Sequence, residues 1–134
     1  MRLIDPAPGE VIDRITILQL KIIRAQTDPK CGLRSTTTGS HWQEEVNALM
    51  LRLQGWSLRL EWFSSFLELA AVNGLLWQAM DRMDGYRASY TDQDIPDVAA
   101  LGLQIYSLNT RRANIVSEIN QWMGRLQDKP REKQ

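Results

Sequence analysis

Apolar residues recur along the chain at spacings of three and four, which is the period of an amphipathic helix. The most regular run steps by four and three and consists of Leu101, Ile105, Leu108, Arg112, Ile115, Ile119, Trp122 and Leu126. A second run with the same steps consists of Trp62, Phe66, Leu69, Asn73, Leu76, Met80 and Met83. Both are heptad-type patterns and predict two long amphipathic helices.

Two shorter helices are predicted upstream. The first runs from about residue 9 to 26, with an apolar face of Val11, Ile15, Leu18 and Ile22. The second starts at Ser40, whose spacing to Gln43 is that of a capping box, and extends to about Leu53. Residues 28–40 between them predict a mobile loop. No segment alternates with period two for long enough to form a strand, so the sequence predicts an all-α, up-down bundle of about four helices with heptad-type seams.

The chain of 134 residues suits one domain and can bury a core without disulfides. We assign this domain to residues 1–126. Residues 127–134 are charged and contain Pro130, so they predict a disordered tail.

Composition narrows the functional classes. The 16 basic and 16 acidic residues cancel, whereas a nucleic-acid-binding domain normally carries a basic excess. No apolar stretch is long enough to span a membrane, and no signal peptide is recognised. Cys31 is the single cysteine, so no internal disulfide can form, which favours a cytoplasmic protein. With His41 as the single histidine, the chain offers too few ligands for a zinc site, and we expect no metal site. No phosphate-binding glycine loop is present, and we expect no cofactor.

Each long seam contains one polar residue at a core position, Asn73 in the first and Arg112 in the second. The two lie at nearly equal distances along the chain from the loop near Asp92, so antiparallel packing of the two helices should bring them to one level. Asn109 lies one helical turn from Arg112. On the first helix, the four-residue spacing of Glu10 and Arg14 favours an ion pair between them. A buried amide or guanidinium without partners is costly, so we expect acceptors from Asp13 or Glu10 on the first helix.

Two interpretations of this polar layer remain open. In the structural one, Arg112 extends its head into water and Asn73 sets the register of the bundle. In the functional one, the residues form a partly buried, ligand-binding cleft. Its candidate residues are Glu10, Asp13, Arg14, Lys21, Asn73, Trp77, Asp81, Asn109, Arg112 and Asn120.

Three motifs resemble a small bacterial all-helical family. The opening Pro8–Leu18 contains Pro-Gly-Glu, Asp-Arg and Thr-Ile-Leu; the middle motif is Val72-Asn73 with Leu76-Trp77; the last comprises Tyr106, Asn109, Arg112, Ala113, Ile119 and Asn120. The resemblance implies an all-helical fold and a bacterial or phage source. Relatives tend to be encoded beside genes for enzymes that transfer sugars onto surface polysaccharide. Relatives carry an acidic pair where this chain has Met80 and Asp81, and Ala7 and Val116 also depart from the pattern.

These observations leave three functions open. The first is a binding or accessory module in bacterial surface-glycan assembly, with an anionic small molecule or a sugar-transfer enzyme as partner. The second is a small helical enzyme that catalyses by electrostatics, as helical chorismate mutases do. The third is a structural homodimer built on exposed Trp and Leu residues.

Overall fold

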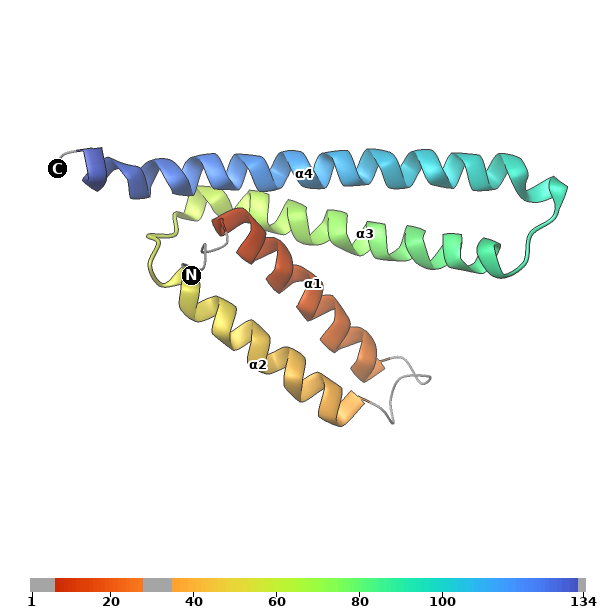
Figure 1. Cartoon of the computed structure of the whole chain (residues 1–134), viewed down its shortest axis with the longest axis horizontal. Helices are drawn as coiled ribbons and strands as arrows, with labels where there is room; N and C mark the ends of the chain where they lie inside the picture. The colour runs from red at the N-terminus through yellow and green to blue at the C-terminus, as the bar shows by residue number, and fades with distance from the viewer. Residues whose placement is uncertain (1–6, 28–34, 133–134) are drawn as a thin grey trace, which may run out of the picture.

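Four α-helices make up most of the described chain, which contains no strand within residues 7–27 and 35–132. In this computed structural model, side chains are described for residues 7–27 and 41–124. The helices are α1 (Pro8–Thr27), α2 (Ser35–Leu53), α3 (Phe63–Ala88) and α4 (Ile95–Glu132). Short 3-10 turns at Leu60–Trp62 and Asp92–Asp94 lead into α3 and α4. Successive helices run in opposite directions (Figure 1), which confirms the all-α, up-down arrangement.

Two helix boundaries differ from the sequence prediction. Helix α2 begins at Ser35, so Ser40 lies inside the helix rather than at its cap. The rest of the predicted mobile loop, residues 28–34, lies outside the described residues. Helix α4 continues to Glu132, so residues 127–132 form its last turns and not the start of a tail. Gln, Lys, Arg and Glu in this stretch are good helix formers, and no glycine follows Leu126 to end the helix.

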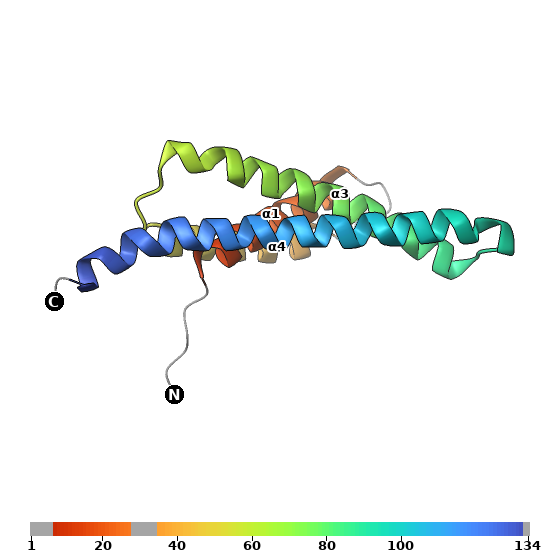
Figure 2. The same cartoon turned by 90° about the horizontal axis from the view of Figure 1, so that it is seen from above.

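Helix α1 is the central element of the fold. It packs against α2, α3 and α4, whereas α2 packs mainly on α1. Helices α3 and α4 form a long hairpin, and Figure 2 shows that α3 crosses α4 obliquely. The most deeply buried side chains come from α1, α3 and α4 and are Val11, Leu18, Leu69, Ile119 and Met123.

The described seam positions are buried or partly buried with one exception, and the fully buried ones include Leu69, Leu76, Leu101, Ile115 and Ile119. Met80 is an exception, because 54% of it is exposed. Val72 and Ala79, which lie beside the seam on α3, are buried as well. The strict heptad step therefore drifts away from the core at Met80, where no fourth helix closes the bundle.

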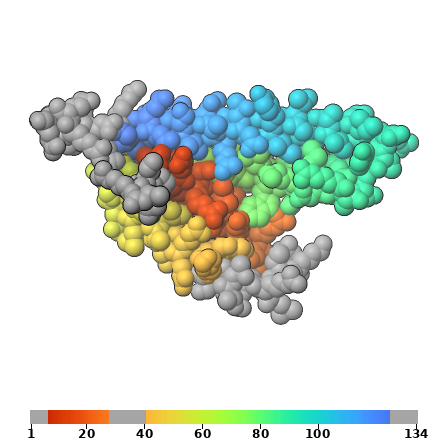
Figure 3. Space-filling model, in the orientation of Figure 1, coloured from red at the N-terminus to blue at the C-terminus, as the bar shows by residue number. Residues whose placement is uncertain are grey.

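The α3–α4 hairpin is longer than α1 and α2, and its far end projects beyond them (Figure 3).

Candidate functional site

The centre of the site is an ion pair between α1 and α4. The Nε atom of Arg112 donates to both carboxylate oxygens of Asp13, at 3.0 and 3.2 Å, and Nη2 donates to Oδ2 at 2.5 Å. Two guanidinium nitrogens thus bind one carboxylate in a bidentate ion pair. This geometry makes an Arg–carboxylate pair both strong and well oriented. The pair is partly shielded from water, with 33% of the Arg112 side chain and 14% of the Asp13 side chain exposed.

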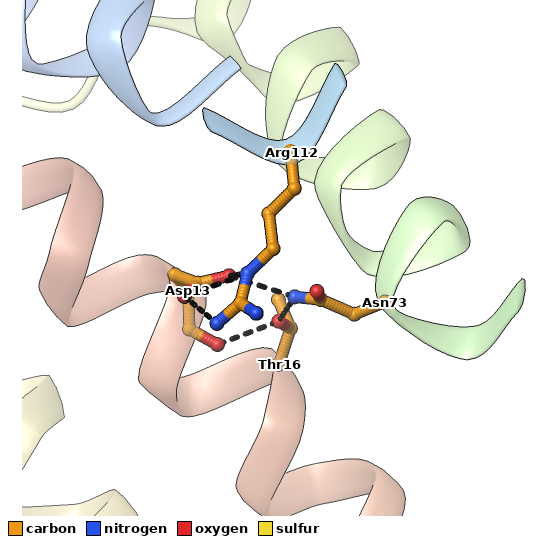
Figure 4. A network of polar contacts seen from close by, with 4 residues as sticks. All are labelled: Asp13, Thr16, Asn73 and Arg112. Atoms are coloured by element: carbon orange, nitrogen blue, oxygen red, sulfur yellow. Dashed lines mark hydrogen bonds and ion pairs between the residues drawn. The ribbon is translucent and has the colours of Figure 1, made fainter. Parts of the chain in front are cut away.

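Asn73 brings α3 into the same network (Figure 4). Its Nδ2 atom donates to Asp13 Oδ1 at 2.8 Å and to Thr16 Oγ1 at 2.7 Å. The Thr16 hydroxyl in turn donates to the Asp13 carbonyl at 2.7 Å. Arg112 and Asn73 therefore lie at one level of the hairpin, with Asp13 as their shared acceptor, as the spacing of the two seams predicted. The network joins three helices whose residues are far apart in the sequence.

The network leaves two polar atoms without a partner. Arg112 Nη1 and Asn73 Oδ1 make no hydrogen bond with any residue of the described part of the chain. Among described side chains, the buried polar atom without a partner is Trp56 Nε1, so both unpaired atoms of the network remain accessible to solvent. A guanidinium N–H and an amide oxygen can therefore still bind a ligand.

A groove of about 310 Å³ adjoins the network. Its polar end is formed by Asn73, Asn109 and Arg112, and Asn109 is exposed. Its other lining residues are Ile17, Leu20, Leu76, Trp77, Met80, Asp81 and Asp84. The groove thus combines an apolar wall with a few polar groups, as small-molecule sites commonly do.

The charges at the groove's other end are compensated. Arg24 forms an ion pair with Asp81 at 2.6 Å and lies over the Trp77 ring, 5.0 Å from its centre. Asp84 forms an ion pair with Arg87 at 3.1 Å. The two acidic side chains therefore do not make the groove a site of strong negative charge.

Four of the residues predicted from the sequence belong neither to the Asp13–Arg112 network nor to the lining of the groove. Arg14 pairs with Glu45 of α2 at 3.1 Å, not with Glu10 as its four-residue spacing suggested. Glu10 is exposed in the first turn of α1. Lys21 lies over Trp42 of α2, 5.9 Å from the ring centre. Asn120 contacts Gly9 at the start of α1.

Asn120 of α4 caps α1 from outside the helix. Its Oδ1 accepts a hydrogen bond from the Gly9 N–H at 2.6 Å, and this N–H is one of the donors that a helix start leaves unpaired. The residue before the helix, Ala7, has no side chain that could accept this bond. A Cβ on Gly9 would lie 2.7 Å from Asn120 Oδ1 and would collide with the Val116 carbonyl. Glycine at this position therefore allows α1 and α4 to approach closely.

Sequence reasoning missed Thr16, Asp84 and the pairing of Arg24 with Asp81. Thr16 was detectable, because it lies three residues after Asp13 and thus on a neighbouring part of the same helix face. Arg24 and Asp84 depend on the angle at which α1 meets α3, which the spacing along one helix does not specify.

The described residues hold no group of three or more His, Cys, Asp or Glu side chains that could bind a metal ion. Over the same part of the chain, no helix is both long and apolar enough to cross a membrane. A scan against protein-family models found no match, and searches of curated proteins and of solved structures found none either.

Proposed function

We propose that the protein is a small-molecule-binding module and that its ligand occupies the groove beside the Asp13–Arg112 pair. The observation that carries this proposal is the incomplete pairing of the network. Arg112 and Asn73 both line the groove, and Arg112 Nη1 and Asn73 Oδ1 have no hydrogen-bond partner in the described part of the chain, so a ligand in the groove can bind them in place of water. Binding in bacterial surface-glycan assembly, as an accessory to a sugar-transfer enzyme, is the setting that the resemblance of its sequence motifs supports.

The lining suggests the chemistry of the ligand. Trp77 and Met80 offer a flat and a flexible apolar surface, which suit a ring or another apolar group. At the other end, Arg112 keeps one free nitrogen because Asp13 occupies the other two. This nitrogen suits one acceptor oxygen, such as that of a carboxylate or a phosphate. We therefore expect a small molecule with a ring face and a single anionic group, and not a highly charged one.

A thermal-shift screen tests the proposal. Its panel contains nucleotides, sugar nucleotides, sugar phosphates and ring carboxylates. A ligand at a hundred times its Kd should stabilise the fold by about 2.7 kcal/mol, which for a chain of this length raises Tm by roughly 10 °C. Hits are then measured by calorimetry on the wild type and on variants.

Asn109→Ala and Asn114→Ala form a matched pair for this purpose. Both residues are exposed on α4, but Asn109 lines the groove and Asn114 does not. Loss of one hydrogen bond at Asn109 should weaken binding about 3- to 10-fold, whereas Asn114→Ala should leave Kd unchanged. Met80→Glu places a negative charge in the groove lining and should also weaken binding of an anionic ligand. Equal affinities of all three variants would show that the compound binds elsewhere. A panel without any hit would contradict the proposed ligand class.

A further inference from the structure

A second surface exposes an unusual number of large apolar side chains, and its groove shares no lining residue with the Arg112 groove. It covers the end of α2, the turn that follows, and the start of α3, and we call it the turn surface. Its members are each about half exposed or more and are Met50, Leu51, Leu58, Leu60, Phe63 and Leu67. Leu60 is the extreme case, with 88% of its surface in solvent. Contiguous apolar surface of this kind is rare on monomers and marks interaction sites.

The turn surface also contains a groove of about 590 Å³. Its floor includes Ile12 and Ile15 of α1, Leu53 of α2 and Phe66 of α3, and Leu60 and Phe63 lie at its edge. The groove exists because α2 packs on α1 and hardly touches α3, so the space between these helices is not closed. Nearby, the indole N–H of Trp56 is buried without an acceptor in the described residues, a further indication that this region is incomplete.

We infer that a second copy of this chain covers the turn surface and forms a two-fold symmetric dimer. A two-fold interface brings the same patch of both copies together, so the patch must be complementary to itself. The turn surface meets this condition in shape, because it carries a projecting side chain, Leu60, beside an apolar groove. In the dimer, Leu60 of each copy enters the groove of the other.

The charges beside Leu60 are also complementary to themselves. Arg59 and Glu61 flank Leu60 in the sequence, and Arg59 Nη1 lies 3.3 Å from Glu61 Oε1. Their side chains are 55% and 64% exposed. An ion pair this exposed contributes little within one chain. Around a two-fold axis, Arg59 of one copy can instead face Glu61 of the other, once on each side. Both signs within one small patch favour a second copy over a partner of one strong charge.

The exposed area permits such an interface. Its apolar part comes from the six half-exposed or more exposed side chains of the turn surface and from the groove beside them. A standard interface removes about 800 Å² from each partner. The dimer does not depend on the proposed ligand, because the turn surface and the Arg112 groove have no lining residue in common.

Sedimentation and light scattering between 1 and 100 µM test the inference. The full chain should show twice the monomer mass of 15.4 kDa, and Leu60→Glu should show the monomer mass. Leu103→Glu is the matched control, because Leu103 is 71% exposed on α4, outside the turn surface. Circular dichroism checks that both variants keep the helical fold. A monomeric wild type at 100 µM, or a dimer that only Leu103→Glu disrupts, would overturn the inference.

A charge-swap experiment identifies the partner as a second copy. Arg59→Glu leaves two acidic residues in the patch and Glu61→Arg leaves two basic ones, so each variant alone should dimerise at least 10-fold more weakly than the wild type. Mixed together, the two variants should form a heterodimer, because each then faces the opposite charge. If the mixture stays as weakly associated as the separate variants, the two residues do not meet across a two-fold axis and the inferred geometry is wrong.

Discussion

Replacing Arg112 by Ala should destabilise the fold, because it removes the cation that compensates a largely buried carboxylate. Asp13 would lose contacts from Nε and Nη2 of Arg112 and would keep only the Asn73 amide as a side-chain donor. With 14% of its side chain exposed, Asp13 cannot recover full hydration. The negative charge would then be stabilised by one hydrogen bond in place of a bidentate ion pair.

The expected cost follows from the burial of the pair. Breaking a fully buried ion pair costs about 3–5 kcal/mol. Here one-third of the Arg112 side chain is exposed and Asn73 still donates to Asp13, so we expect a lower cost of about 2–3 kcal/mol. For a chain of this length, that loss lowers Tm by roughly 8–12 °C.

Two double variants then separate the charge from the hydrogen bonds. Asp13→Asn with Arg112→Met removes both charges but keeps an acceptor for Asn73, and should recover most of the lost stability. Asp13→Leu with Arg112→Met also removes that acceptor, so Asn73 keeps only Thr16 as a partner. This second variant should be about 1 kcal/mol less stable than the first.

Urea unfolding followed by circular dichroism measures these differences. Arg111→Ala is the control, because the neighbouring Arg111 binds Glu68 at 2.6 Å but is 65% exposed. Loss of such a surface pair should cost less than about 1 kcal/mol. Equal and small effects of Arg111→Ala and Arg112→Ala would refute the reasoning, since the Arg112 pair would then behave as a solvated one.

Two further predictions concern the backbone. Gly9→Ala should lower the free energy of unfolding by about 1–3 kcal/mol, because its Cβ collides with α4. Gly102→Ala, with open space around it, should instead raise stability by about 0.5–1 kcal/mol. Thermal melts compare the two variants, and equal effects would disprove the close approach of α1 and α4. Asp94→Ala should cost about 1 kcal/mol in the same assay, because the Asp94 carboxylate accepts the Thr91 N–H at 2.9 Å in a capping box before α4. Asp92→Ala serves as its control, and a loss as large as that of Asp94→Ala would show that general charge, not the cap, is responsible.

The sequence predicted the fold and the centre of the site because both depend on periodicity. The two seams and the short loop between them were enough to bring Asn73 and Arg112 to one level, and the cost of a buried guanidinium required an acid such as Asp13. Ion pairs between different helices were harder to predict from the sequence. Arg14 reaches Glu45 rather than Glu10, and Met80 is exposed, because these outcomes depend on how α2 and α3 are placed around α1.

The contact between Gly9 and Asn120 has a consequence for the order of folding. It joins residues 111 positions apart, and the Asp13–Arg112 pair joins residues 99 apart. The α3–α4 hairpin closes through a short turn, whereas docking of α1 on α4 closes a loop of about 100 residues, which is slower. Helix α1 is synthesised before α4, so both contacts can form only after α4 has been made. Until then the N–H of Gly9 stays in water and Asp13 lacks its cationic partner, so the polar contacts that join α1 to α4 form late.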